Sequence, residues 1–113
     1  MEQAKRFAQL SAPRQVLVRL LQSINFGYLE GLEVRCSDPV FSPAPVAFVE
    51  VKLDAGNDPR PEADLPDFEL RSEVTRLLEQ FDQLGNGSIE RIDVRHGVPR
   101  RAVIERPFRE VRR

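Results

Sequence analysis

Residues 27–35 read GYLEGLEVR, and residues 87–95 read GSIERIDVR. The two stretches align without a gap, with identical residues at four of nine positions and conservative exchanges at three more. Upstream, the tripeptide RLL occurs at residues 19–21 and again at 76–78, so the separation is 57 residues there and 60 in the later stretch. This difference predicts three extra residues before the second glycine. Similarity in successive segments, in the same order, indicates an internal repeat.

Each copy begins with the pattern of an amphipathic helix. Apolar residues recur at helical spacing over residues 16–24 and over residues 74–81. We expect Ser11 to be the N-cap of the first helix and Asp64 to be the N-cap of the second, because short oxygen-bearing side chains accept hydrogen bonds from the first N–H groups of a helix. Asparagine and glycine, which tolerate a left-handed backbone, follow both patterns and predict the helix ends.

Each repeated stretch then predicts a strand with one buried and one charged face. Leu32 and Val34 alternate with charged residues, and the second copy repeats this pattern. Leu29 and its counterpart Ile89 are out of phase with the alternation. A β-bulge at the residues that follow them would return both side chains to the core.

Return strands are expected at residues 47–53 and 101–105. The first would follow a long, proline-rich turn, and the second a tight turn at His96-Gly97, where glycine accepts a positive φ. Prolines flank both return strands. Because proline cannot donate to a strand ladder, these strands are expected at the edges of the sheet.

These elements predict a single α+β domain over residues 1–113. It would consist of a tandem α-β-β repeat, with units at about 11–53 and 64–108 and a Pro- and Asp-rich loop at 54–66 between them. The four strands would form an antiparallel sheet in the order 2-1-3-4, with the two helices on one face.

Three segments of the second unit match the pattern of a known family: residues 87–90 (GSIE), 94–97 (VRHG) and 103–106 (VIER). In these segments the chain resembles the small YezD-like family of uncharacterised bacterial proteins, and the first copy diverges more. The resemblance implies a bacterial protein and carries over no activity, since that family has none assigned. It also suggests that this chain is a fused version of what a one-unit relative would build by dimerising.

No stretch predicts a catalytic, metal or cofactor site. Residues 82–93 resemble a calcium-binding EF-hand loop with Asp82 at its first position, but Leu84 offers no oxygen at the third, and the residues that follow predict a strand where a helix is needed. His96, the single histidine, is interpreted as a turn residue, and Cys36, the single cysteine, as a residue at a strand end. We therefore expect a non-enzymatic protein without a cofactor.

Charge is distributed unevenly along the chain, whose net charge is −1. Residues 1–87 carry nine basic and fourteen acidic side chains, whereas residues 88–113 carry eight arginines and four acids. Acids interleave with these arginines, and Phe108 is the single aromatic residue that we expect beside them to stack on bases. Nucleic-acid binding is therefore the alternative function rather than the leading one, with contacts expected from Arg91, Arg95, Arg100, Arg101 and Arg106.

The leading expectation is a domain that acts through protein contacts, either by self-association as a homodimer or with another protein. Edge strands and an open sheet face are common docking surfaces. Nothing in the chain approaches the ~18 consecutive apolar residues of a membrane span. The N-terminus also lacks an apolar signal-peptide core, so we expect a cytoplasmic protein that does not contact a membrane.

Overall fold

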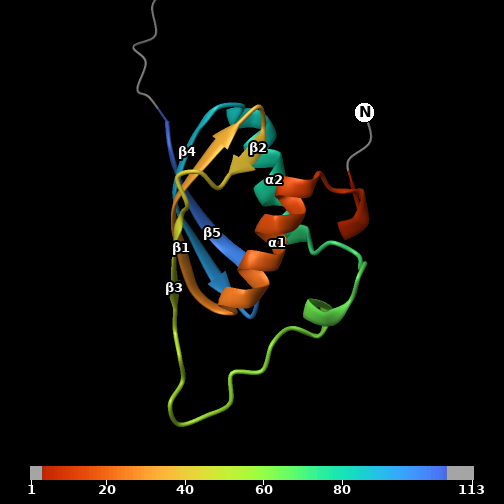
Figure 1. Ribbon diagram of the computed structural model, residues 1–113, viewed down its shortest axis with the longest axis vertical. Helices are drawn as coiled ribbons and strands as arrows, with labels where there is room; N and C mark the ends of the chain where they lie inside the picture. The colour runs from red at the N-terminus through yellow and green to blue at the C-terminus, as the bar shows by residue number, and fades with distance from the viewer. Residues whose placement is uncertain (1–3, 107–113) are drawn as a thin grey trace, which may run out of the picture.

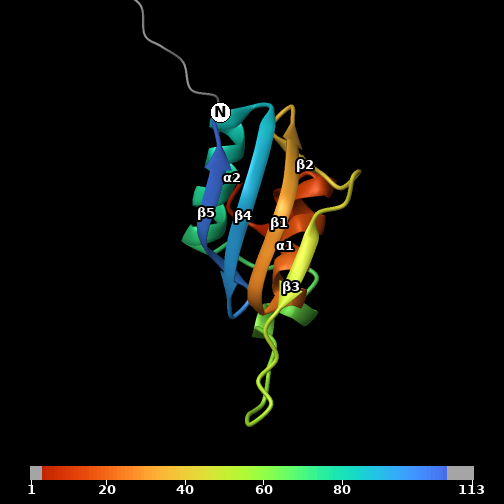
Figure 2. The same ribbon diagram turned by 90° about the vertical axis from the view of Figure 1, so that its left-hand side faces the viewer.

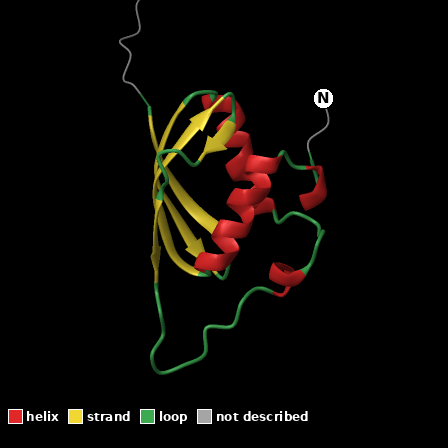
Figure 3. Cartoon of the chain, in the orientation of Figure 1, coloured by secondary structure: helices red, strands yellow, loops and turns green. Residues whose placement is uncertain are grey.

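Two helices pack against one face of an antiparallel sheet, and no helix of the described chain covers the other face (Figures 1, 2 and 3). The computed structural model describes residues 4–106. The sheet has five strands, so the protein is a mixed α+β protein. In chain order the elements are η1 (Phe7–Gln9), α1 (Ala12–Ile24), β1 (Phe26–Arg35), β2 (Asp38–Val40), β3 (Val46–Val49), η2 (Pro61–Asp64), α2 (Ser72–Leu84), β4 (Gly87–Arg95) and β5 (Val98–Glu105).

The two helices begin in different ways. α1 follows Ser11, whose Oγ accepts a hydrogen bond from the backbone N–H of Arg14 at 3.4 Å, so the expected N-cap is confirmed. α2 begins at Ser72, with Arg71 in the N-cap position and no side-chain hydrogen bond to the cap. The expected cap at Asp64 is wrong, since Asp64 lies in η2.

An extended segment before α2 explains this difference. Phe68 is buried and stacks on Phe7, with ring centroids 4.9 Å apart. The carbonyl of Phe68 accepts a hydrogen bond from the N–H of Phe7 at 2.9 Å, and the N–H of Leu70 donates to the carbonyl of Lys5 at 2.8 Å. These contacts hold the segment extended, so the helix begins only after it.

β1 and β4 are neighbours in the middle of the sheet, and β5 pairs with the other side of β4 (Figure 2). Two short strands, β2 and β3, share the outer side of β1, so the sheet has five strands instead of the expected four. Pro43 and Pro45 lie between β2 and β3. Because proline has no backbone N–H, neither residue can donate a hydrogen bond to β1. β3 ends at Val49, before the expected end at Leu53, and β5 begins earlier than expected, at Val98.

Both hairpins close with two-residue turns. The φ angles are 51° and 65° at Cys36 and Ser37, and 51° and 74° at His96 and Gly97. Positive φ at both central residues is the type I′ turn, whose twist matches that of the flanking strands. The tight turn at His96-Gly97 is confirmed, whereas the long first turn is wrong, because β2 follows Ser37 directly and ends at Val40.

The two out-of-phase residues of the repeated strands lie on the core side, as expected. Leu29 and Leu32 are each 1% exposed, and Ile89 and Ile92 are each 0% exposed. The pairing of β4 with β5 shifts in register between Ile89 and Arg91. This shift is a β-bulge, and it explains how two residues three positions apart in a strand both face the core.

The two helices are separated by the same interval at both of their ends. α1 and α2 each contain 13 residues, and 60 residues separate both their starts and their ends. Asn25 and Gly85 end the helices with nearly the same backbone angles, φ 62°, ψ −64° and φ 69°, ψ −70°. The expected three extra residues before the second glycine are therefore wrong. Apolar residues recur every three or four positions along a helix, so the 57-residue match aligned the two stripes in a shifted register.

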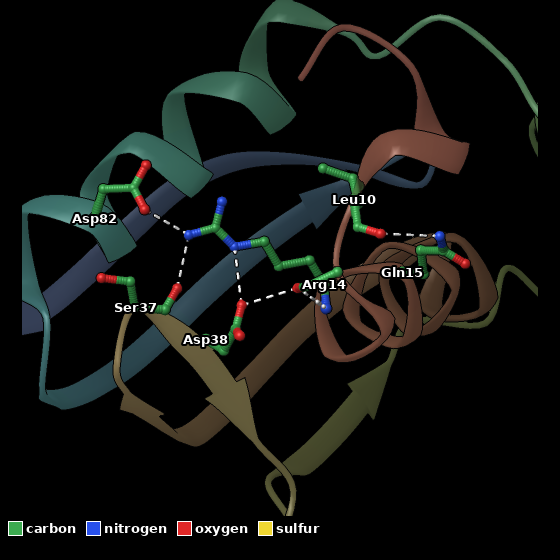
Figure 4. A network of polar contacts seen from close by, with 7 residues as sticks. Leu10, Arg14, Gln15, Ser37, Asp38 and Asp82 are labelled. Atoms are coloured by element: carbon green, nitrogen blue, oxygen red, sulfur yellow. Dashed lines mark hydrogen bonds and ion pairs between the residues drawn. The ribbon is translucent and has the colours of Figure 1, made fainter. Parts of the chain in front are cut away.

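A polar network around Arg14 joins α1 to α2 and to the first hairpin (Figure 4). Nη2 of Arg14 donates to Oδ1 of Asp82 and to the carbonyl of Ser37, both at 2.7 Å. Its Nε lies 3.2 Å from Oδ1 of Asp38, which also accepts a hydrogen bond from the Ser11 hydroxyl at 2.9 Å. The Arg14 side chain is 16% exposed, so these contacts are screened by water less than surface ion pairs are.

Arg19 holds the segment that connects the two halves. Its Nη1 donates to the carbonyls of Glu62 and Ala63 at 3.1 and 3.2 Å, and its guanidinium lies 4.3 Å above the ring of Phe7. The expected connecting loop at 54–66 therefore contains η2, and Arg19 fastens η2 to α1.

Candidate functional site

The sheet face opposite the helices, which we call the outer face, is formed across its width by β3, β1, β4 and β5 (Figure 2). The strand register aligns Phe48 of β3, Tyr28 of β1, Asp93 of β4 and Arg101 of β5 in one row. The chain neighbours of this row in β1 and β4 belong to the buried core. Because successive side chains point to opposite faces of a sheet, the row itself lies on the outer face.

The two aromatic residues of this row stack on each other, and Arg91 from the neighbouring row lies against Tyr28. The rings of Tyr28 and Phe48 are nearly parallel, with centroids 4.7 Å apart and an interplanar angle of 15°. Cζ of Arg91 lies 3.9 Å from the centroid of the Tyr28 ring, which is the geometry of a cation–π contact. Phe48 is 40% exposed, so ring surface at this end of the stack is open to a ligand.

Beside the stack, the carboxylate of Asp93 forms ion pairs with two arginines. Nε of Arg91 donates to Oδ1 of Asp93 at 2.7 Å, and Oδ2 of Asp93 lies 3.3 Å from Nε of Arg101. The hydrogen bond to Asp93 raises the pKa of the Arg91 guanidinium, so this group is charged at any pH at which the protein is folded. The cluster of two guanidiniums and one carboxylate is locally positive.

A second aromatic pair lies at the end of the same face. The rings of Phe26 and His96 stack with centroids 6.0 Å apart and an interplanar angle of 14°. Nζ of Lys52 lies 4.4 Å from the centroid of the Phe26 ring. Flat rings with neighbouring cations therefore recur along the outer face.

Between these groups the outer face is hollowed. The hollow has a volume of about 810 Å³ and is open to solvent. Its charged lining consists of four arginines and two acids, in a chain whose net charge is −1. The hollow is lined by Phe26, Gly27, Tyr28, Phe48, Val49, Glu50, Arg91, Asp93, Val94, Arg95, Arg100 and Arg101.

Four of the five arginines expected to contact nucleic acid line this hollow, namely Arg91, Arg95, Arg100 and Arg101. Arg106 does not line it, because its Nη2 donates to Oε1 of Gln80 in α2 at 3.2 Å. Phe108 and the last three arginines of the sequence lie outside the described residues.

The expectation that aromatic platforms are missing apart from Phe108 is wrong. Tyr28 and Phe48 stack beside Arg91, and Phe26 lies on the same face. Side chains alternate between the two faces along β1, and this alternation places Tyr28 on the charged face. The register that brings Phe48 of β3 beside Tyr28 has no signal in the sequence.

The edge strand β3 is a second exposed feature. All four of its residues are exposed, with exposed fractions of 54% for Val46 and 55% for Val49. The apolar pattern continues beyond the strand at Val51, which is 61% exposed. The N–H of Glu50 donates to the carbonyl of Phe26 at 2.7 Å. Because hydrogen-bonding groups alternate in direction along an antiparallel strand, Val49 and Val51 direct theirs away from β1.

Past the end of β1, the side chain of Asn57 takes the hydrogen bonds of the inward-facing backbone groups that follow β3. Nδ2 of Asn57 donates to the carbonyl of Lys52, and the N–H of Lys52 donates to Oδ1 of Asn57, both at 3.2 Å. No described strand pairs with the outer side of β3. The opposite edge differs, because β5 carries Pro99 and exposed charges at Arg100, Arg101 and Glu105.

The residues weighed for metal or thiol chemistry have structural surroundings. Asp82 of the EF-hand-like stretch pairs with Arg14. Oδ1 of Asn86 in the same stretch accepts a hydrogen bond from the N–H of Cys36, whose thiol is free and exposed. Within residues 4–106, no group of three or more His, Cys, Asp or Glu side chains is placed to hold a metal ion. None of the helices in that range is long and apolar enough to cross a membrane.

No family model, curated protein or solved structure matches the chain. Function is therefore inferred from the two exposed features, the outer-face hollow and the β3 edge.

Proposed function

We propose that this chain is a non-enzymatic interaction domain that associates with a second copy of itself through the edge of β3. The observation that carries this proposal is the apolar, unprotected edge at Val46–Val49 and its continuation through Val51 to Leu53. An edge strand presents unpaired N–H and C=O groups, and natural proteins protect such edges with charge, proline or a covering segment. β5 has that protection and β3 lacks it, so β3 is the edge that recruits another strand.

A second copy suits this edge because its charges are self-complementary. If the segments that continue β3 in two copies pair antiparallel about Val51, Glu50 of each copy lies opposite Lys52 of the other. Val49 then lies opposite Leu53 in both halves of the interface. The same patch would serve both copies, which is the isologous contact of a two-fold dimer.

The relation between the two halves of the chain supports an origin by duplication, as a tandem α-β-β repeat. Residues paired between β1 and β4 keep their register when the halves are exchanged, since Gly27 pairs with Val94 and Val34 with Gly87. In this proposal the β1–β4 contact is the one that a one-unit, YezD-like relative would make by dimerising. The same origin accounts for a sheet with four strand positions in the order 2-1-3-4. The first position is shared by the two short strands β2 and β3.

A reducing compartment fits the single exposed free thiol at Cys36, and we place the domain in the cytoplasm on that ground. The same association surface would then be presented to other cytoplasmic proteins. Self-association is the form with the stronger support, because its charge pairing follows from this sequence alone.

Sedimentation velocity with charge variants tests the self-association. The unmodified chain is expected to approach twice its 12.9 kDa as its concentration rises from roughly 1 to 200 µM. Glu50→Lys and Lys52→Glu should each give a monomer, because each places like charges opposite one another. The double variant Glu50→Lys/Lys52→Glu should restore the dimer.

Val51→Lys supplies an independent variant, since it would place two lysines face to face at the symmetry axis. Its matched control is Val16→Lys on α1, since Val16 is an apolar residue with a similar exposed fraction, 52%, and is not part of the proposed pairing. A monomer at every concentration, or a dimer that all of these variants leave intact, contradicts the proposal.

A further inference from the structure

We propose that the hollow on the outer face binds single-stranded nucleic acid. Unpaired bases would stack on the group formed by Phe48, Tyr28 and Arg91. Phosphates would lie against Arg95, Arg100 and Arg101. This inference goes beyond self-association, because it assigns a ligand to a surface that shares only Val49 and Glu50 of its lining residues with the proposed contact between copies.

The stack is the first reason for a ligand with flat, unpaired rings. The nearly parallel rings of Phe48 and Tyr28 have centroids 4.7 Å apart, and Cζ of Arg91 lies 3.9 Å from the centroid of the Tyr28 ring. Both ends of this stack, a phenyl ring and a guanidinium plane, are groups on which nucleobases stack. A duplex would not use them, because its bases already stack on one another.

The arginines are the second reason. Among the described residues, neither Arg95 nor Arg100 has a hydrogen-bond or ion-pair partner, and Arg101 shares Asp93 with Arg91. Four arginines therefore face two acids, Glu50 and Asp93, around the hollow. Guanidinium groups in excess over carboxylates favour a polyanion and a bidentate contact with phosphate oxygens.

The shape of the hollow is the third reason. Its volume of about 810 Å³ lies within the ~300–1,000 Å³ range of ligand sites. The hollow is open along the sheet and bounded by rings on one side and arginines on the other. A strand of nucleotides, with bases on one side and phosphates on the other, matches this division.

An acidic peptide is the competing occupant, and it would use only part of the surface. Arginines alone suffice for carboxylates, so a peptide gives no role to the exposed ring of Phe48. Replacement of this ring therefore distinguishes the two ligands, while replacement of arginines does not.

Fluorescence anisotropy with labelled single strands of about 12 nucleotides tests the site, with uridylate and thymidylate strands as probes. At about 50 mM salt the unmodified chain is expected to bind both, and affinity should fall about tenfold by about 200 mM salt. Phe48→Leu should weaken binding about tenfold, and Phe48→Trp should retain it. An acidic peptide of equal charge should compete weakly.

Charge variants supply the matched control. Arg95→Ala/Arg101→Ala should weaken binding by at least about tenfold. Arg71→Ala/Arg76→Ala removes the same charge from exposed positions at α2 and should change affinity less than about twofold. Circular dichroism would check that every variant is folded.

Three results overturn the proposal: no binding at about 50 mM salt with protein in the ~100 µM range, equal loss from both arginine pairs, or equal affinity for Phe48→Leu and the unmodified chain. Equal affinity for a duplex of the same length also overturns it. Because self-association is read by sedimentation and this site by anisotropy, either proposal can fail alone.

Discussion

The backbone N–H of Gly97 donates a hydrogen bond to the carbonyl of Asn25 at 2.8 Å, so the turn of the second hairpin is fastened to the end of the first helix. The converse contact has the same length, from the N–H of Ser37 to the carbonyl of Gly85. Each half of the chain therefore caps a helix of the other half. Both contacts depend on positive φ angles in the turns.

Gly97→Ala is expected to lower the free energy of unfolding by about 1–2 kcal/mol. Gly97 has φ 74°, and a Cβ there would lie 3.3 Å from Cα of Gln22. Ser37→Ala is the matched control, because Ser37 already has a side chain at φ 65° and uses backbone groups for its contacts to Gly85 and Arg14. Urea unfolding measures both, and equal losses would contradict the role of Gly97.

Arg14→Met is expected to lower the free energy of unfolding by about 1–3 kcal/mol, since it leaves Asp82 and the carbonyl of Ser37 without this donor and removes the ion pair with Asp38. Arg35→Met, at an exposed position of β1, should change it by less than about 0.5 kcal/mol. Denaturant titration of the two variants checks this difference. A loss no larger than that of Arg35→Met would mean that the network of Figure 4 does not stabilise the fold.

Arg19→Lys should expose the segment at 54–66 to protease while leaving the sheet intact. An ammonium group cannot keep both the contacts to the carbonyls of Glu62 and Ala63 and the planar contact with Phe7. Limited proteolysis followed by mass spectrometry should show cleavage in this segment several-fold faster than in Arg76→Lys. Unchanged cleavage would show that other contacts hold the segment.

Asp67→Asn should destabilise the protein at about pH 7, and its effect should shrink as the pH falls below about 4. The hydrogen bond from Arg6, at 2.8 Å, and one from the N–H of Ala8 hold the pKa of the Asp67 carboxyl below its ordinary value. A carboxyl with a lowered folded pKa stabilises the protein above its unfolded pKa of about 3.9, and this stabilisation is lost as the pH falls through the folded pKa. Urea midpoints of both proteins against pH test this, and a difference independent of pH would contradict it.

The alternation of apolar and charged residues predicted which side chains of the two central strands face the core. The out-of-phase residues Leu29 and Ile89 indicated core positions, and both are buried. The same reasoning failed for the helices, since stripes that repeat every three or four residues allow a shifted alignment. It also failed at Asp64, where a cap-like residue precedes a segment held extended by the stacking of Phe68 on Phe7.

The candidate sites were less accessible from the sequence because they depend on register. Cys36-Ser37 forms a two-residue turn without a glycine, so the usual sequence signal of such a turn is missing and the first hairpin cannot be predicted from it. With that register unknown, Phe48 could not be placed beside Tyr28. The arginines were recognised by their density, but the aromatic half of the surface was not.

Amide hydrogen exchange at two protein concentrations tests the self-association most directly. At high concentration, the amides of Val49 and Val51 should exchange markedly more slowly than in dilute solution, because their N–H groups would then donate to a second copy. Amides of the β5 edge, such as that of Val103, should exchange at the same rate in both. Exchange at Val49 and Val51 that does not depend on concentration would contradict association through β3.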